Sequence, residues 1–555
     1  MSSIVAWCLL VFGYLLKRYP YDGLYGQDSY AYYYQARALL DEFTGKPPQA
    51  WALFSTDQLY HWPIGYHIHL ILGQIITGGV DGGRAITIIT AVGAAVVLYL
   101  LVGELFHTAS RFVRVLAGLV AGMALPLVAT FTRMGLSVMA DVPALFWGLL
   151  AIFLCLRSWS QSVPGESDGG GAQTTGKRRV ASALIGGLAL GIAVLIRYAS
   201  AFFIIPVVIY LAFRFFGSRS AMPAKTRLYV RLRYPVLFVS GFALGILPQI
   251  LYLITHTHLL SNGELPAAYG DWINGWSPAN LFASTVTNSD GTATFPQPMI
   301  AFYLLQPLYD SDQGFLSGYY IPALLSGIAS TVQRRLWPVL ATLVAWWLVP
   351  ALFYSGTTYQ AHRFALTYLP VLLIFTGIGA ATVVEHCMQA LRRISERSTA
   401  LRLPIRPIIS VFASAIVLLG LAAGVYKAQG SVRGWMQIHE SFKVDEQLVL
   451  ALTRQAAGAY PPDSPPKLVA FGMTEALFHY TQWPTIELFN SDDAVLSSFL
   501  RAPGAHILVL PVDAISAQWA GTPLAGRWSW LQQTYNLVPE GSAATYTVFK
   551  IEPKP

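Results

Sequence analysis

The sequence predicts an α-helical polytopic membrane protein with a small C-terminal α/β domain. Of its 555 residues, 54% are hydrophobic and 12% are charged, and the mean hydropathy is +0.50. This composition is too apolar for a soluble chain of that length. Apolar runs that can cross a hydrocarbon core of about 30 Å recur between clusters of Lys and Arg. Short apolar runs of strand length follow the last of these spans.

The apolar runs and the residues that interrupt them indicate about eleven membrane spans. They lie near residues 4–16, 84–106, 113–131, 142–157, 180–196, 198–216, 235–255, 314–332, 336–353, 364–384 and 407–426. We interpret the first run as an uncleaved span, because it lacks the basic flank and the small-residue cleavage site of a signal peptide. We therefore expect a transmembrane domain over residues 1–426 and a C-terminal extracytoplasmic α/β domain over 427–555.

The distribution of positively charged residues predicts the orientation of these spans in the membrane. Lys and Arg gather in alternate loops, most densely at 214–233, whereas the loop 256–313 contains neither. The positive-inside rule then places the N-terminus in the cytoplasm and, with an odd number of spans, the C-terminal segment outside. Lys17 and Arg18 at the outer end of the first span run against this bias. The net charge of +8 is thus a topology signal and does not indicate nucleic-acid binding. We expect a multi-pass protein of the plasma or inner membrane, in contact with its lipids.

Three loops between the predicted spans have distinct compositions. The first outer loop, 17–83, is rich in Tyr and Trp, and its amphipathic stretch 31–40 predicts a helix lying along the membrane interface. The inner segment 158–176 is rich in Gly, Ser and Thr, which is typical of a flexible linker. The outer loop 256–313 carries further Trp and Pro residues.

The C-terminal segment has the pattern of a small water-soluble domain. Residues 468–471 and 506–510 are short apolar runs, and 544–551 alternates in the manner of an edge or surface strand. Residues 445–457 predict one of the helices between them.

Cysteine chemistry and common nucleotide motifs are not supported. Cys8, Cys155 and Cys387 fall in or beside apolar spans, so that neither a disulfide framework nor a zinc site is indicated. The sequence also lacks a phosphate-cradling Gly-rich loop and a Gly-x-Ser-x-Gly elbow.

Asp28 is the strongest candidate for chemistry. It follows the first span in Tyr25-Gly26-Gln27-Asp28-Ser29, directly before an aromatic segment close to the membrane surface. A carboxylate there can accept a proton from an attacking hydroxyl or ligate a divalent cation. The alternative is a helix N-cap that satisfies free backbone amides, and the two roles are compatible.

A second carboxylate and two arginines are predicted at the same face. Asp141 precedes Val142 and Pro143 at the outer mouth of the fourth span, where it could share a base, cation or substrate role with Asp28 or act as an N-cap. Arg197 and Arg363 lie at the outer boundary of their spans. A lipid phosphate is a reasonable partner for each, and snorkelling to headgroups is the alternative.

Other polar residues carry weaker signals. His61, beside Trp62 and Pro63, is a candidate substrate contact, although the histidines of this loop are too scattered for a ligand set. Asp310 and Asp312 have the spacing of a metal-binding pair but are more typical of a solvated turn.

Several motifs follow one another in a recognisable order. They are Gly26–Tyr30 with Ala36–Leu39, Trp62–Tyr66, Asp141–Pro143, Gly191–Arg197, and Arg363 with Phe364 and Pro370. With the layout of spans and the C-terminal domain, this order resembles the GT-C-type membrane glycosyltransferases, and is similar to the lineage of protein O-mannosyltransferases and lipid A aminoarabinose transferases. Many members carry Glu directly after the first-loop Asp, where this sequence has Ser29.

The resemblance implies a glycosyltransferase that uses a polyprenyl-phosphate sugar as donor on the outer side of the membrane. The acceptor is a hydroxyl or amine on a glycan, lipid or protein, and transfer usually inverts the anomeric carbon. Asp28 is the implied general base, with Asp141 as second acidic residue. Arg197 and Arg363 would stabilise the departing lipid phosphate, and Tyr30, Tyr66 and His61 would contact substrate. A divalent cation, Mg²⁺ or Mn²⁺, is possible, with Asp28 and Asp141 as its ligands if it binds.

Two other classes of function compete with this hypothesis. A transporter or flippase for lipid-linked glycans would use the same outer aromatics and arginines, but it predicts paired broken helices and internal repeats. A non-enzymatic receptor or assembly subunit would use the C-terminal segment as a binding module.

Overall fold

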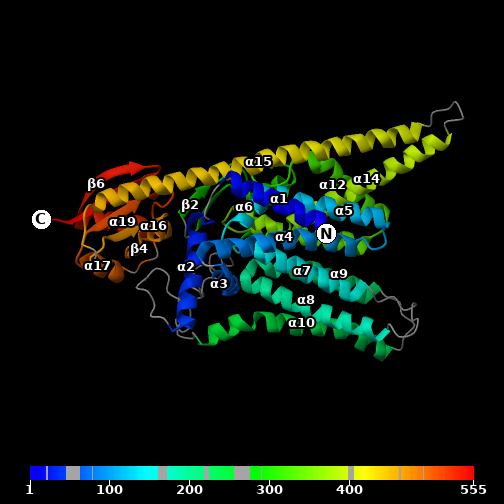
Figure 1. Ribbon diagram of the computed structural model, residues 1–555, viewed down its shortest axis with the longest axis horizontal. Coiled ribbons are helices and arrows are strands. Elements are labelled where there is room, and N and C mark those ends of the chain that lie inside the picture. Colours follow the sequence, from blue (N-terminus) through cyan, green and yellow to red (C-terminus); the bar gives the residue numbers. More distant parts are fainter. Residues whose placement is uncertain are drawn as a thin grey trace.

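The computed structural model describes residues 1–19, 23–45, 63–77, 79–160, 172–217, 224–255, 275–288, 291–397, 405–461, 464–489, 491 and 493–554. The molecule is elongated, with a helical bundle and a C-terminal α/β domain that are joined by one long helix, α15 (Figure 1). The bundle helices are α1 (Ser2–Arg18), α4 (Gly79–Leu105), α5 (Arg111–Ala124), α6 (Ala129–Leu136), α7 (Asp141–Ser160), α8 (Ala172–Ile196), α9 (Ile204–Gly217), α10 (Ala224–Thr255), α12 (Ile321–Gln333), α13 (Trp337–Ser355), α14 (Leu369–Arg397) and α15 (Ile405–Ala457).

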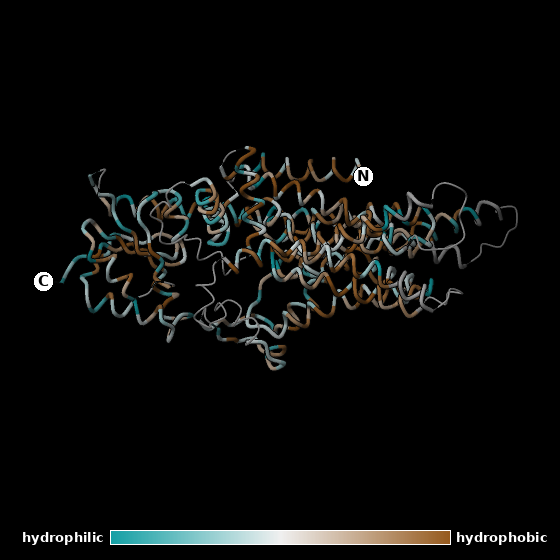
Figure 2. The backbone as a smooth tube through the Cα atoms, turned by 90° about the horizontal axis from the view of Figure 1, so that it is seen from below, coloured by the Kyte–Doolittle hydropathy of each residue, from teal (hydrophilic) through white to brown (hydrophobic). Residues whose placement is uncertain are grey.

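Each predicted span overlaps at least one of these helices, although the span at 113–131 covers both α5 and the start of α6, and the span at 314–332 begins before α12. Seven described helices are individually long and apolar enough to cross a membrane, or up to eight if the bent pair of α5 and α6 counts as one span. The rest are shorter, such as α12 with 13 residues. The fold class is therefore confirmed, while the total of about eleven spans stays a prediction. Hydrophobic residues run along the whole bundle, but in the C-terminal domain they are interspersed with hydrophilic ones (Figure 2).

Glycines allow the closest helix contacts in the bundle. A Cβ atom added at Gly187 of α8 would lie 1.8 Å from the carbonyl oxygen of Phe238 in α10, and one at Gly379 of α14 would lie 1.7 Å from that of Ala323 in α12. Such contacts let backbones approach where lipid provides no hydrophobic driving force between helices.

The first loop forms α2 (Gly26–Phe43) and α3 (Gly65–Thr77). α2 lies crosswise over the end of the bundle that carries the C-terminal domain (Figure 1). It contains the helix predicted at 31–40 and starts earlier, at Gly26, whose φ is +61°. The N-cap is Tyr25, so that Asp28 lies inside the first turn. The N-cap alternative for Asp28 is therefore wrong.

The C-terminal domain contains a five-stranded sheet of order β4-β3-β5-β7-β6. Its elements are β3 (Lys467–Ala470), α16 (Thr474–Thr481), β4 (Thr485–Glu487), α17 (Asp493–Arg501), β5 (His506–Leu510), α18 (Val512–Ala517), α19 (Pro523–Thr534), β6 (Tyr535–Ala543) and β7 (Tyr546–Pro553). β4, β3 and β5 are parallel, and β7 and β6 continue the sheet antiparallel. The end of α15 and α16 cover one face, and α17, α18 and α19 cover the other.

α15 crosses the predicted domain boundary. It is one continuous helix of 53 residues that includes both the last predicted span and the helix predicted at 445–457. The helix continues through Gly430 and Gly434, which stand just after the junction of its apolar and polar halves, and the boundary at 426/427 therefore falls inside a helix. The predicted Gly-rich linker lies largely outside the described residues, as does the first part of the loop 256–313.

Candidate active site

Asp28 and Arg363 form an ion pair at the end of the bundle. Nη1 of Arg363 donates to Oδ2 of Asp28, and both side chains are about one third exposed. Asp28 lies in the first turn of α2, and Arg363 lies in the short helix η10 (His362–Thr367) that precedes α14. Two segments that are far apart in the sequence thus meet at one charge pair.

Asp141 and Arg197 form a second, more buried pair. Nη1 of Arg197 donates to Oδ1 of Asp141, whose side chain is 2% exposed against 18% for the arginine. Asp141 opens α7, and Arg197 lies between α8 and the short helix η4 (Tyr198–Phe203). Oδ2 of Asp141 is buried and has no hydrogen-bond partner among the described residues. The carboxylate can accept a further hydrogen bond.

The two pairs belong to one cluster. The guanidinium carbons of Arg197 and Arg363 lie 5.3 Å and 5.7 Å from the centre of the Phe364 ring. Tyr32, one turn after Asp28 on the same face of α2, is buried, and its hydroxyl interacts electrostatically with all four charged side chains. The structure therefore brings together the four charged residues that the sequence singled out, and adds Tyr32.

The cluster is balanced in charge. Burial disfavours the charged form of Arg363, but the attraction of Asp28 and Asp141 outweighs it and raises the pKa of the guanidinium above its ordinary value. The described residues contain no group of three or more His, Cys, Asp or Glu side chains that could hold a metal. Each acid is already paired with a guanidinium, so this arrangement does not fit a resident divalent cation, which prefers several oxygen ligands.

The structure describes the surroundings of two of the three predicted substrate contacts. Tyr66 is buried, its hydroxyl lies 3.2 Å from that of Thr87, and its ring packs edge-on against Tyr32 at 4.9 Å. Tyr66 therefore contacts the cluster through Tyr32. Tyr30 lies on another face of α2, where its hydroxyl donates to Oε2 of Glu446 at 2.8 Å. His61 lies outside the described residues.

The predicted turn at Asp310 and Asp312 contacts α15. Nζ of Lys427 donates to Oδ2 of Asp312 at 2.8 Å, and Ser431 donates to its Oδ1 at 3.1 Å. The hydrogen bond from Lys427 holds the pKa of the Asp312 carboxyl below its usual value.

An aromatic and basic cluster between α6 and α15 was not anticipated. The guanidinium of Arg133 lies 4.2 Å from the ring centre of Trp435 and 5.6 Å from that of Tyr25. Tyr25 stacks on His439 at 3.8 Å, and Trp435 packs against His362 at 5.6 Å. Tyr25 and His362 flank the helix turns that carry Asp28 and Arg363, and α15 thereby braces both sides of the ion pair.

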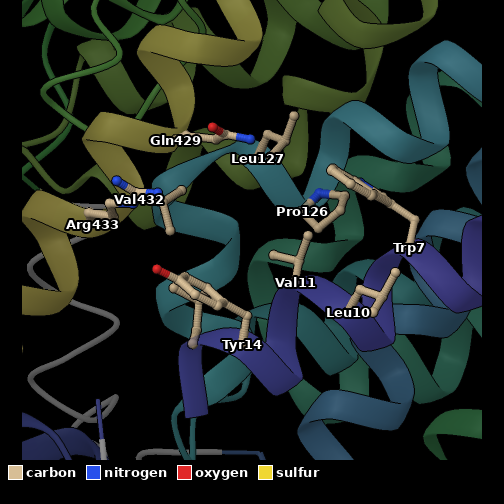
Figure 3. Close-up of a pocket in the computed structure, with 10 residues that line it drawn as sticks. Trp7, Leu10, Val11, Tyr14, Pro126, Leu127, Gln429, Val432 and Arg433 are labelled. Carbon is tan, nitrogen blue, oxygen red and sulfur yellow. The ribbon is translucent and has the colours of Figure 1, made fainter. Parts of the chain in front are cut away.

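A separate groove opens between α1, the bend at η3 (Leu125–Leu127) and α15 (Figure 3). Its volume is about 210 Å³. Its walls are mainly apolar and include Trp7, Val11 and Pro126, with Arg433 at the rim. None of the charged residues of the Asp28 cluster lines it.

A family model matches part of the chain. Residues 31–259 match the family model described as dolichyl-phosphate-mannose-protein mannosyltransferase. This range includes Asp141 and Arg197. No curated protein matches the sequence.

Solved structures share the fold over nearly the whole chain. ArnT from Cupriavidus metallidurans bound to undecaprenyl phosphate is 14% identical, with 99% of this chain and 97% of that chain covered and a TM-score of 0.59. The archaeal oligosaccharyltransferase AglB from Archaeoglobus fulgidus, in complex with an inhibitory peptide and a dolichol-phosphate, is 15% identical, with 98% and 74% covered and a TM-score of 0.54. The chain is therefore similar to this mannosyltransferase family over residues 31–259, and over nearly its whole length it has the fold of these two proteins.

Proposed function

We propose that the protein transfers a sugar from a polyprenyl-phosphate-linked donor to an acceptor hydroxyl or amine, with Asp28 as general base. The observation that carries the proposal is the meeting of the Asp28–Arg363 and Asp141–Arg197 pairs around Phe364. The cluster lies at the end of the bundle that faces the C-terminal domain. The neighbours named above, which bind undecaprenyl phosphate or dolichol-phosphate, support a lipid-linked donor.

In the proposed reaction, the acceptor oxygen or nitrogen attacks the anomeric carbon of the sugar. The bond between that carbon and the phosphate oxygen breaks, and the electron pair leaves with the polyprenyl phosphate. Asp28 takes the acceptor proton, and the anomeric configuration inverts. Arg197 and Arg363 stabilise the charge that develops on the departing phosphate.

The ion pair suggests how the base is activated. In the ion pair, one oxygen of the Asp28 carboxylate is engaged by Arg363. A donor phosphate competes for that arginine. When Arg363 turns to the phosphate, this carboxylate oxygen becomes available to the acceptor, at the moment when the donor is in place.

The remaining assignments belong to the same proposal. We place the active site and the C-terminal domain on the extracytoplasmic side of the plasma or inner membrane, as the distribution of Lys and Arg indicates. The acceptor can be a glycan, a lipid or a protein. A requirement for Mg²⁺ or Mn²⁺ would oblige Asp28 and Asp141 to exchange their arginine partners for the cation.

The experiment is a transfer assay with the purified protein and a panel of polyprenyl-phosphate sugars, with and without Mg²⁺ or Mn²⁺. Asp28→Asn should lower turnover by about 10²–10⁴-fold, which is the usual contribution of a general base. Glu42→Gln, an exposed carboxylate on the same helix, is the matched control and should leave turnover unchanged. Normal transfer by Asp28→Asn would refute the assigned base.

The transporter hypothesis is tested in the same preparation. It predicts paired broken helices, whereas the described part of the chain has one bent pair, α5 and α6, with an angle of 66°. Movement of a lipid-linked sugar across liposome membranes without any sugar transfer would favour the transporter.

A further inference from the structure

The C-terminal domain contacts α2 through α16, the helix that follows β3. β3 lies between β4 and β5 in the parallel part of the sheet, and the chain passes from β3 through α16 to β4 on one side and later to β5 on the other. In open parallel sheets, ligands bind outside the carboxyl ends of strands where the order reverses in this way. Glu475, in the first turn of α16, and Glu487, the last residue of β4, both lie at this edge.

Contacts between α16 and α2 fix this edge beside the active site. The hydroxyl of Tyr34 lies 2.7 Å from Nδ1 of His479, and Nε2 of Gln482 donates to the same hydroxyl at 3.2 Å. Phe478 packs edge-on against the Tyr34 ring at 5.1 Å. Glu475 lies one turn before His479 and therefore on the same side of α16. Figure 1 shows α16 at the side of the domain nearest to α2.

Glu475 has unused hydrogen-bonding capacity at this position. Its Oε2 is buried and has no hydrogen-bond partner among the described residues. Burial, the neighbouring carboxyl of Glu487 and the charge of Asp28 raise the pKa of Glu475 well above its usual range. These effects favour the neutral form of the carboxyl, which can both donate and accept hydrogen bonds.

The surroundings of Glu475 are acidic. The pKa of the Tyr546 hydroxyl is raised to about 12, by burial and then by Glu446, Glu475 and Asp445. Nζ of Lys443 lies 2.9 Å from Oε2 of Glu446 and offsets that charge. Burial beside other acids favours the neutral form of a carboxyl, and a neutral carboxyl can hydrogen bond a neutral partner without burying an unpaired charge.

We propose that Glu475 binds the acceptor, by hydrogen bonding a hydroxyl group of a glycan and holding that glycan beside Asp28. The assignment rests on the proposed function and names its acceptor class. Two carboxyl groups at one edge, those of Glu475 and Glu487, suit the neighbouring hydroxyls of a sugar ring better than the single hydroxyl of Ser or Thr. The C-terminal domain would then supply the acceptor side of the site, and the arginines of the bundle would supply the donor side.

Equilibrium binding tests this assignment without relying on turnover. The purified full-length protein is titrated with a panel of methyl glycosides and, separately, with a serine-containing peptide. The wild type should bind at least one glycoside, and Glu475→Gln should weaken that binding about tenfold, as the loss of one good hydrogen bond would. Glu440→Gln, an exposed carboxylate of α15, should bind as the wild type does.

Activity and stability readouts separate a binding role from a structural one. In the transfer assay, Glu475→Gln should raise the acceptor KM and leave the acceptor-independent hydrolysis of the donor unchanged, and the thermal midpoint should not fall. Equal glycoside binding by the wild type and Glu475→Gln, binding of the peptide alone, or binding of no glycoside at all overturns the proposal. Failure of the wild type to use any polyprenyl-phosphate sugar would instead overturn the proposed function, and the titration would still report on Glu475.

Discussion

Replacing Arg197 by Met tests whether the buried pair is an electrostatic unit. The substitution keeps an unbranched apolar stem but leaves the Asp141 carboxylate, which is 2% exposed, without its partner. Breaking a buried pair from one side typically costs about 3–5 kcal/mol, because an uncompensated charge stays behind. Arg197 is itself 18% exposed, and water can partly replace it, so that the lower end, about 3 kcal/mol, is expected.

The partner substitution should cost less than this. Asp141→Asn removes the buried charge and leaves a guanidinium that reaches solvent, for which about 1–2 kcal/mol is expected. The double variant, Asp141→Asn with Arg197→Met, should therefore be more stable than Arg197→Met alone. The free energies of unfolding are measured in mixed detergent micelles, and the four proteins form a double-mutant cycle.

A surface pair provides the control for this cycle. Asp81 and Arg84 also form an ion pair, but the Asp81 side chain is 76% exposed. Their coupling energy should lie at about 0–1 kcal/mol. If Arg197→Met costs no more than Arg84→Met, or if the double variant is the least stable of the four, the reasoning from burial is wrong. Transfer activity should not return in the double variant, because the arginine that we assign to the phosphate is still missing.

Two further predictions concern packing and pH. Gly187→Val should destabilise the bundle by about 1–3 kcal/mol, because the added side chain would collide with the Phe238 carbonyl. Gly103 has open space around it, so Gly103→Ala should be neutral or slightly stabilising in the same thermal unfolding assay. Burial and the charge of Arg133 lower the pKa of His362 from 6.5 to about 4, so that the unfolded chain binds more protons between these values and stability should rise as pH increases from 4 to 6.5. His362→Gln should flatten that rise in the thermal midpoint, and an unchanged slope would show that His362 is not buried in this way.

The bundle could be predicted because span length and charge bias are local properties of the sequence. Apolar runs in the sequence predicted the helices. Asp141, Arg197 and Arg363 stood out because they are charged residues at the ends of apolar spans. The pairing of Asp28 with Arg363 could not be predicted, because it joins segments 335 positions apart. Tyr32 carried a usable signal, since it is one helical turn from Asp28 and shares its face.

The strands and the candidate binding residue of the C-terminal domain were harder to predict from the sequence, for physical reasons. The strand predicted at 544–551 corresponds to β7 (Tyr546–Pro553), but its partner β6 contains Pro539 and Gly541, and the register shifts between them. Such residues weaken a strand pattern. Glu475 gave no signal, because a lone acid in the first turn of a short helix is ordinary. Its position matters only through the sheet edge and α2, which the fold brings together.

The continuity of α15 has a mechanical consequence. A helix of 53 residues is roughly 80 Å long, and the part from Lys427 to Ala457 extends roughly 45 Å beyond the last predicted span. A rigid rod of that length works as a lever: a change of tilt of about 5° in the bilayer would move its far end by roughly 4 Å, more than the length of a hydrogen bond. The contacts of Tyr30 with Glu446 and of Asp312 with Lys427 connect α15 to the rest of the protein at two points along its length. Any change of this tilt would therefore change the distance between the bundle and the C-terminal domain, the two parts to which we assign the donor and acceptor sides of the site.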